Sequence, residues 1–110
     1  MLGLEHTSTL DTVNSLGNLY VEQGRLSDAE AMYKRALRGY EKALGPEYVD
    51  TYIPAQNTIR NLAVLYTQLR KISDARALYV RCQNGVEALF GVQHERYQEV
   101  TRELALLDDC

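Results

Sequence analysis

The sequence has few of the residues that would mark several common classes of protein. It has 110 residues, with two cysteines, two prolines, one phenylalanine and no tryptophan. Cys82 and Cys110 are too few and too far apart for a disulfide framework, which favours a reduced intracellular protein with one cysteine in a helical core and one at the tail. No apolar run approaches the roughly 18 residues that span a bilayer, and "LGLEHTSTL" has no signal-peptide pattern. We therefore expect a cytoplasmic protein without membrane contact.

A strong excess of charge of one sign is also missing. The net charge is −3, whereas a nucleic-acid-binding domain normally presents a basic face. The clearest basic cluster is Lys34, Arg35, Arg38 and Lys42. Because Glu30 and Glu41 lie among these residues, the cluster is interpreted as a solvated helix face, and no nucleic-acid partner is expected.

The sequence does contain an internal repeat. "LSDAEAMYKRAL" at residues 26–37 returns as "ISDARALYVRC" at residues 72–82, a shift of 46 positions. The same shift matches leucines, tyrosines and glycines on both sides of this stretch. A repeat of this length is typical of stacked supersecondary units.

Each unit has the pattern of two helices. Apolar residues recur at spacings of three and four. In the first helix of each unit they are Val13, Leu16 and Tyr20, repeated as Ile59, Leu62 and Tyr66. In the second helix they are Ala29, Tyr33 and Ala36, repeated as Ala75, Tyr79 and Cys82. Gly24 is expected to end the first helix, and Ser27 or Ser73 to cap the second. Small residues at Gly17/Ala63 and Ala29/Ala75 would let the two helices approach closely. Each unit is therefore predicted to be an antiparallel helical hairpin, with Leu16, Tyr20, Leu62 and Tyr66 buried.

The chain is predicted to form one domain, 1–110, with five helices at about 8–23, 27–44, 52–69, 73–90 and 95–108. Repeat 1 covers about 3–44, repeat 2 about 45–90, and 91–110 form a partial third repeat or capping helix. Repeat 2 has four extra residues around "TYIPAQN", about one helical turn, which we expect to lengthen its first helix. Pro54 is compatible only with the first turn, so that helix should begin around residues 50–53.

The pattern Val13-x-x-Leu16-Gly17-x-x-Tyr20, followed by Gly24, Ala29, Tyr33 and Ala36, resembles the tetratricopeptide repeat (TPR) signature over essentially the whole chain. A 42-residue step from Leu2-Gly3 to Leu44-Gly45, with "LGxxH", "NxLxxLY" and "AExLYxRAL", is similar to repeats of kinesin light chains and of some NACHT/NB-ARC-type signalling proteins. The resemblance implies an all-α fold, a right-handed α-solenoid of antiparallel helix pairs with about two and a half repeats. The second copy departs from the signature at Arg70, in place of the turn glycine, and at Cys82, in place of alanine.

Residues that could carry chemistry are scarce. His6 and His94 occupy equivalent connector positions two repeats apart, which predicts a separation of roughly 20 Å from the helix spacing, too far for one metal ion. No phosphate-binding loop, CxxC or HExxH motif occurs, and the serines are interpreted as helix caps or helix-face residues without a histidine to act as a base. We expect no enzyme activity, no cofactor and no metal.

A binding surface is the remaining candidate, because stacked hairpins form a concave face lined by the first helix of each unit. The predicted concave residues are Asp11, Asn14, Ser15, Asn18, Glu22, Asn57, Arg60, Asn61, Val64, Gln68, Glu99, Arg102 and Glu103. Asparagine can both donate to and accept from a peptide backbone. Kinesin-light-chain-like repeats hold peptides with such asparagines, which the resemblance implies for Asn14, Asn18 and Asn61. Arg60 and Arg102 could favour acidic ligand side chains. The predicted peptide-binding residues are thus Asn14, Asn18, Asn57, Arg60, Asn61 and Arg102, in an adaptor or scaffold with a protein or peptide partner.

A second hypothesis is that the chain is a structural or self-association segment of a larger TPR-containing signalling protein. It begins within a connector at Leu2-Gly3, and about three units are normally needed to bury the apolar faces. In the last helix, Leu104, Leu106 and Leu107 have no following helix to cover them. These leucines could form a homo-oligomer.

Overall fold

The computed structural model describes residues 6–108, so the Leu2-Gly3 connector and Cys110 lie outside the described residues. The described part consists of α1 (Thr7–Glu22), α2 (Leu26–Leu44), a short 3₁₀ helix η1 (Val49–Thr51), α3 (Ile53–Gln68), α4 (Ile72–Phe90) and α5 (Glu95–Asp108). It contains no strand among these residues. The five predicted helices are confirmed, and their ends are within about two residues of the expected positions.

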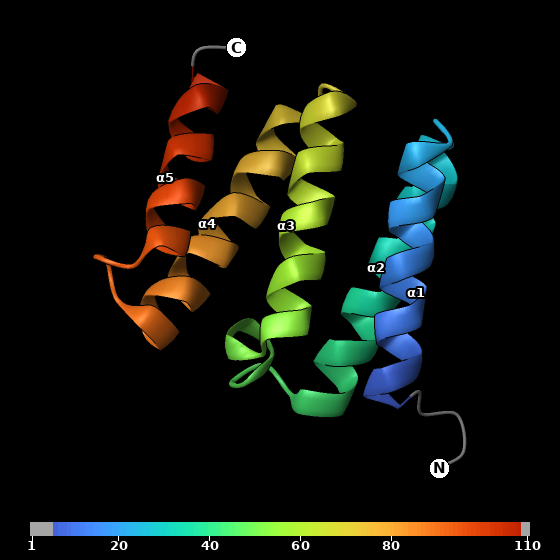
Figure 1. Cartoon of the computed structure of the whole chain (residues 1–110), viewed down its shortest axis with the longest axis horizontal. Coiled ribbons are helices and arrows are strands. Elements are labelled where there is room, and N and C mark those ends of the chain that lie inside the picture. The colour runs from blue at the N-terminus through green and yellow to red at the C-terminus, as the bar shows by residue number, and fades with distance from the viewer. Residues whose placement is uncertain (1–5, 109–110) are drawn as a thin grey trace.

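The helices form two layers. Figure 1 shows α1, α3 and α5 side by side in one layer, with α2 and α4 behind them, and the principal dimensions are 44 × 32 × 20 Å. Helix α1 packs against α2, α3 packs against α4, and α5 packs against α4. The chain is therefore a short stack of antiparallel helix pairs.

The two hairpin turns have the same backbone geometry but different residues. Gly24 has φ 76°, and Arg70 at the equivalent position has φ 64°. The following amide donates to a carbonyl of the helix that has ended, Arg25 N–H to Tyr20 O and Lys71 N–H to Tyr66 O, both at 2.8 Å. This is the helix-ending motif in which glycine is preferred, because a side chain is strained at positive φ.

The prediction that Ser27 and Ser73 cap the second helices is wrong. The capping positions lie two residues earlier, at Arg25 and Lys71, and neither residue makes a side-chain capping bond. The tight turn before each helix leaves no extended residue at the serine, so both serines fall within the first helical turn.

The four extra residues of repeat 2 do not lengthen its first helix, contrary to expectation. Helices α1 and α3 each have 16 residues. The connector 45–52 contains η1, whereas the shorter connector 91–94 contains no helix. Pro54 explains the difference, because proline lacks the N–H group of a helix interior and α3 cannot extend far before it. The extra residues instead place Val49, which is 1% exposed, in the core.

Small residues permit close helix packing, as predicted. A Cβ atom at Gly17 would lie 2.6 Å from the ring of Tyr33. Ala29, Ala63 and Ala75 are completely buried. The tyrosines that follow them in the pattern then fill the space between helices.

Two sets of leucines are placed differently from the prediction. Leu16 is 38% exposed, whereas its equivalent Leu62 is 3% exposed. Leu62 belongs to the same buried cluster as Leu37 of α2, whereas no helix within residues 6–108 covers α1 in the equivalent position. At the other end Leu107 is buried and Leu104 packs against the core, because α5 folds back on α4. Of the three leucines expected to be uncovered, Leu106 alone is largely exposed, at 64%.

Candidate functional site

Three of the predicted asparagines meet where α1 and α3 lie side by side. Asn61 Nδ2 donates to Asn14 Oδ1 and to Asn18 Oδ1, each at 3.3 Å. The carbonyl oxygens of Asn14 and Asn18 thus face α3. Among the described residues, neither of their NH₂ groups donates to another side chain, so both remain available to a ligand.

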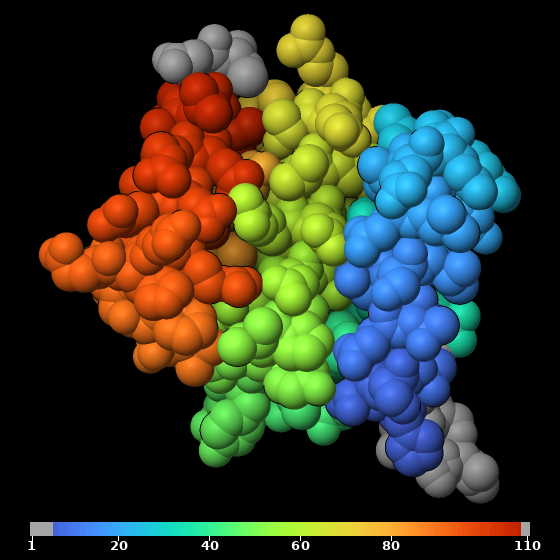
Figure 2. All heavy atoms as spheres, viewed as in Figure 1, coloured from blue at the N-terminus to red at the C-terminus, as the bar shows by residue number. Residues whose placement is uncertain are grey.

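A hollow lies on each side of this asparagine cluster. One, of about 270 Å³, is lined by apolar Val21, Val64 and Leu65 together with Asn18, Glu22, Tyr33, Asn61 and Gln68. The other, of about 240 Å³, is more polar and is lined by Asp11, Asn14, Ser15, Tyr40, Pro54 and Asn57. Figure 2 shows the surface formed by α1 and α3 from the side of α1, α3 and α5. We call the two hollows and the asparagines between them the α1–α3 groove.

Arg60 has a different environment from the one predicted. Its guanidinium donates to both carboxylate oxygens of Glu103, at 3.1 and 3.0 Å, and lies 3.8 Å from Glu99. The bond to Glu103 raises the pKa of Arg60 despite partial burial. Because two carboxylates already neutralise this arginine, the attraction for an acidic ligand that we expected there is largely cancelled. Arg60 fastens α5 to α3 instead.

The remaining predicted residues, Asn57 and Arg102, form no hydrogen bond with the asparagine cluster among the described residues. Asn57 lines the polar hollow, and its Oδ1 accepts a bond of 3.1 Å from Arg96 of α5. Arg102 is exposed on α5 and forms no ion pair with another described residue. Arg60 and Arg102 therefore do not form a shared cationic site.

Three hydroxyl groups that support the groove were not predicted. Thr58, completely buried, donates to Asn14 Oδ1 at 2.9 Å, and the Tyr33 hydroxyl donates to Asn18 Oδ1 at 2.5 Å. The Tyr40 hydroxyl donates to Asp11, and burial together with this carboxylate raises the pKa of Tyr40. Thr58 could have been found from the sequence, because it is a polar residue on the same helical stripe as Leu62. The tyrosine bonds depend on helix packing that the pattern does not specify.

The histidines have roles at the connectors. His94 Nδ1 accepts a bond of 3.1 Å from the Arg96 amide, and its ring stacks on Phe90 with the centroids 4.3 Å apart. His6 precedes the first turn of α1. Within residues 6–108, no group of three or more histidine, cysteine or acidic side chains is arranged to hold a metal ion.

Comparison with known proteins places this arrangement in a family. A tetratricopeptide repeat family model matches residues 9–47 and 56–96, more than half of the chain. The chain belongs to the tetratricopeptide repeat family. This repeat fold is generally a scaffold for protein–protein interaction rather than a catalytic fold.

Among solved structures, the chain is similar to BtubC (BKLC) from P. vanneervenii, with a TM-score of 0.82 and 26% sequence identity. The match covers 96% of this TPR chain and 41% of the BtubC chain, so the TPR chain spans about two fifths of that protein's length. BtubC is itself a kinesin-light-chain-like TPR protein, the subtype that this sequence resembles. No curated protein matches the sequence. None of the helices within residues 6–108 has the length and apolar character to cross a membrane.

Proposed function

We propose that the α1–α3 groove binds an extended peptide segment of a partner protein, so that this TPR chain acts as an adaptor or scaffold module. The asparagine cluster carries the proposal, because it presents amide donors in a groove with a hollow on each side. Hydrogen bonds from Asn14 and Asn18 would hold peptide carbonyls, independently of the peptide sequence. We expect such a module to work in the cytoplasm.

The two hollows suggest what the peptide should contain. An apolar side chain fits the hollow lined by Val21, Val64 and Leu65. The polar hollow contains the carboxylate of Asp11 and no basic residue, so a hydrogen-bond donor or a basic side chain is favoured there. The expected ligand is thus a peptide with an apolar residue at one end of a short extended stretch and a polar or basic residue at the other.

The test begins with selection of peptides from a random library displayed on phage, followed by calorimetry with the selected peptides. Asn18→Ala should weaken binding by about three- to tenfold, because one hydrogen bond contributes about 0.5–1.5 kcal/mol. Asn14→Ala should have a similar effect. Asn61→Ala also removes bonds between α1 and α3, so a small decrease in melting temperature is expected for that variant.

Asn84→Ala is the matched control, because Asn84 is an exposed asparagine on α4, whereas the asparagine cluster lies on α1 and α3. It should bind selected peptides like the original chain. Equal binding by the original chain, Asn14→Ala and Asn18→Ala would contradict the proposal. So would a library that yields no peptide competing for one site.

The second candidate function is assembly with another helix pair, as expected of a structural or self-association segment. Leu19 is 46% exposed, whereas its equivalent Leu65 is 1% exposed. Together with Leu16, it forms an apolar strip on α1 where another unit would stack. Light scattering at high concentration should then give a mass above one chain that returns to one chain in Leu19→Glu; a single-chain mass for the original protein would count against assembly.

A further inference from the structure

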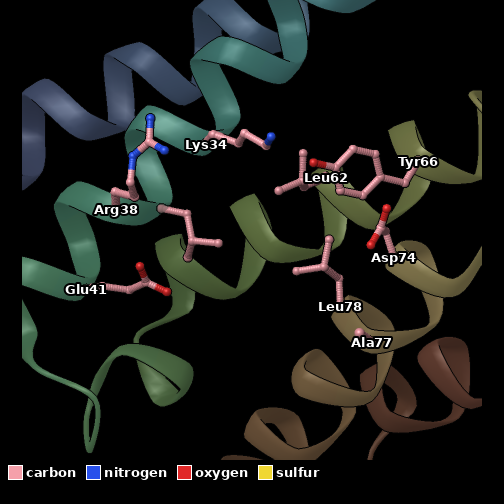
Figure 3. A pocket seen from close by; sticks show the side chains of 9 residues that line it. Lys34, Arg38, Glu41, Leu62, Tyr66, Asp74, Ala77 and Leu78 are labelled. Atoms are coloured by element: carbon pink, nitrogen blue, oxygen red, sulfur yellow. The ribbon is translucent and has the colours of Figure 1, made fainter. Parts of the chain in front are cut away.

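A third hollow lies on the opposite layer of the molecule from the α1–α3 groove. It has a volume of about 320 Å³, within the range of about 300–1,000 Å³ of small-ligand pockets. Figure 3 shows it between α2 and α4, with α3 behind them. Its apolar walls come from Leu37, Leu62, Tyr66 and Leu78. We call it the α2–α4 hollow.

Charged residues of both signs line the rim of this hollow. Lys34, Arg38 and Glu41 belong to α2, and Asp74 belongs to α4 on the other side, as Figure 3 shows. Lys34 is paired with Glu30 at 3.1 Å, and Glu41 is paired with Arg81 at 3.0 Å. Neither Arg38 nor Asp74 forms an ion pair with another residue of the described chain. Arg38 is thus a cation beside an apolar hollow with no carboxylate assigned to it.

We propose that the α2–α4 hollow is a second docking site, which takes a bulky aliphatic side chain of a partner protein with an acidic residue next to it. The aliphatic side chain would lie between Leu37 and Leu78, and the carboxylate would pair with Arg38. Asp74 repels a carboxylate from the opposite rim and so orients the segment toward α2. The basic residues of α2, interpreted from the sequence as a solvated face, then have a ligand of opposite charge.

This site is independent of the α1–α3 groove. The two surfaces belong to different layers, and none of the residues that line the α2–α4 hollow lines either hollow of the groove. The two sites also differ in charge. The groove is lined by the carboxylates of Asp11 and Glu22 and by no basic residue, whereas the α2–α4 hollow is lined by Arg38 and Lys34 as well as by Glu41 and Asp74. One chain could therefore hold two partner segments at once.

The test uses a short blocked peptide, acetyl-Gly-Ser-Leu-Glu-Ser-Gly-amide, titrated into ¹⁵N-labelled protein and followed by NMR. One side chain and one ion pair give weak affinity after the cost of association, so NMR is chosen because it detects millimolar binding. Saturable shifts are expected for the amides of Leu37, Leu62 and Leu78. Two matched peptides, with Lys in place of Glu or Ala in place of Leu, should bind several-fold more weakly.

Variants of the protein separate charge from shape. Arg38→Glu should weaken binding of the Leu-Glu peptide at least about fivefold, the change produced by about 1 kcal/mol. Lys42→Glu is the matched control, because it makes the same charge change on the same helix outside the hollow, and it should have little effect. Ala77→Leu should block binding by filling the hollow, since Ala77 is exposed and lines it.

Several results would overturn the proposal. These are shifts confined to the α1–α3 groove, equal binding of the Leu-Lys peptide, equal loss in Lys42→Glu and Arg38→Glu, or no saturable shift. A dimer that is detected by light scattering and abolished by Ala77→Leu would assign the hollow to a second copy of the chain and would also overturn it. Binding that survives Asn18→Ala but is lost in Ala77→Leu would support a site separate from the groove.

Discussion

The two repeats, α1–α2 and α3–α4, have nearly the same sequence pattern and the same helix lengths but different surroundings. Repeat 2 lies between α2 and α5, whereas no other helix within residues 6–108 lies on the outer side of α1. Leu62 is therefore buried, while its equivalent Leu16 is 38% exposed. The comparison shows that the position of a unit in the stack, as well as its own sequence, determines which apolar residues stabilise the chain.

The largest expected difference between the repeats is at this pair of leucines. Leu62→Ala should lower the free energy of unfolding by about 2–4 kcal/mol, because it leaves a cavity in the core. Leu16→Ala should cost less than about 1 kcal/mol, because the side chain is already partly in water. Denaturant unfolding of both variants measures the difference. Equal losses would mean that a neighbour covers α1 in solution.

A second difference concerns the glycines in the middle of α2 and α4. A Cβ at Gly85 would lie 2.1 Å from the backbone oxygen of Asp50, whereas one at Gly39 would meet a methyl group of Leu10 at 2.4 Å. A backbone oxygen cannot move aside as a side-chain end can, so Gly85→Ala should destabilise the chain by about 2 kcal/mol. Gly39→Ala should cost less, since Leu10 can change its rotamer. Thermal unfolding of the two variants measures which one loses more stability. A larger loss of stability in Gly39→Ala would contradict the close packing of Gly85 against Asp50 of η1.

The hairpin turns allow a change that should stabilise the protein. Arg70 has φ 64°, a conformation that costs a residue with a side chain about 1–2 kcal/mol. Replacing Arg70 with glycine removes this cost, but glycine also has more conformational freedom in the unfolded chain, which offsets part of the gain. Arg70→Gly should therefore raise the free energy of unfolding by about 0.5–1 kcal/mol. The reverse change, Gly24→Arg, should remove a similar amount. Calorimetry would contradict this account of the turns if Arg70→Gly lowered the melting temperature.

The smallest expected difference is at Ala36 and its equivalent Cys82. Burial raises the pKa of Cys82 to about 11, above the usual value of about 8.5. The folded state therefore binds the thiol proton more tightly than the unfolded state does. The resulting contribution to the free energy of unfolding is complete below about pH 8.5 and is lost as the pH rises toward 11.

The variant Cys82→Ala should cost less than about 1 kcal/mol at neutral pH, because Ala36 fills the same position in repeat 1. It should also shift the alkaline decrease in the free energy of unfolding to higher pH. Burial likewise raises the pKa of Tyr33 and Tyr79, so some alkaline loss should remain in the variant. Unfolding curves at several pH values measure both effects, and an unchanged pH profile would contradict the account of Cys82.

The fold could be predicted from the sequence because helix pairs depend on local spacing. The repeated stripes, Gly24 and Pro54 were sufficient to place five helices. The location of the four extra residues was not predictable from length alone, since one helical turn and one 3₁₀ turn need similar numbers of residues. The burial of α5 was also missed, because the pattern of Leu104, Leu106 and Leu107 does not say which of them faces α4.

The candidate site could be predicted only in part. Asn14, Asn18 and Asn61 were found from helical spacing, which places them on facing helices. The pairing of Arg60 with Glu103 depends on how α5 lies against α3, and no sequence spacing determines that angle. The α2–α4 hollow was not predicted, since its basic side was interpreted as solvated.

A crystal structure of the chain with a peptide selected from the library tests the central claim most directly. We predict an extended peptide between α1 and α3, with its carbonyl oxygens at the NH₂ groups of Asn14 and Asn18 and an apolar side chain beside Val64. A peptide bound elsewhere, or bound between α1 and α3 with no contact to these asparagines, would contradict the claim.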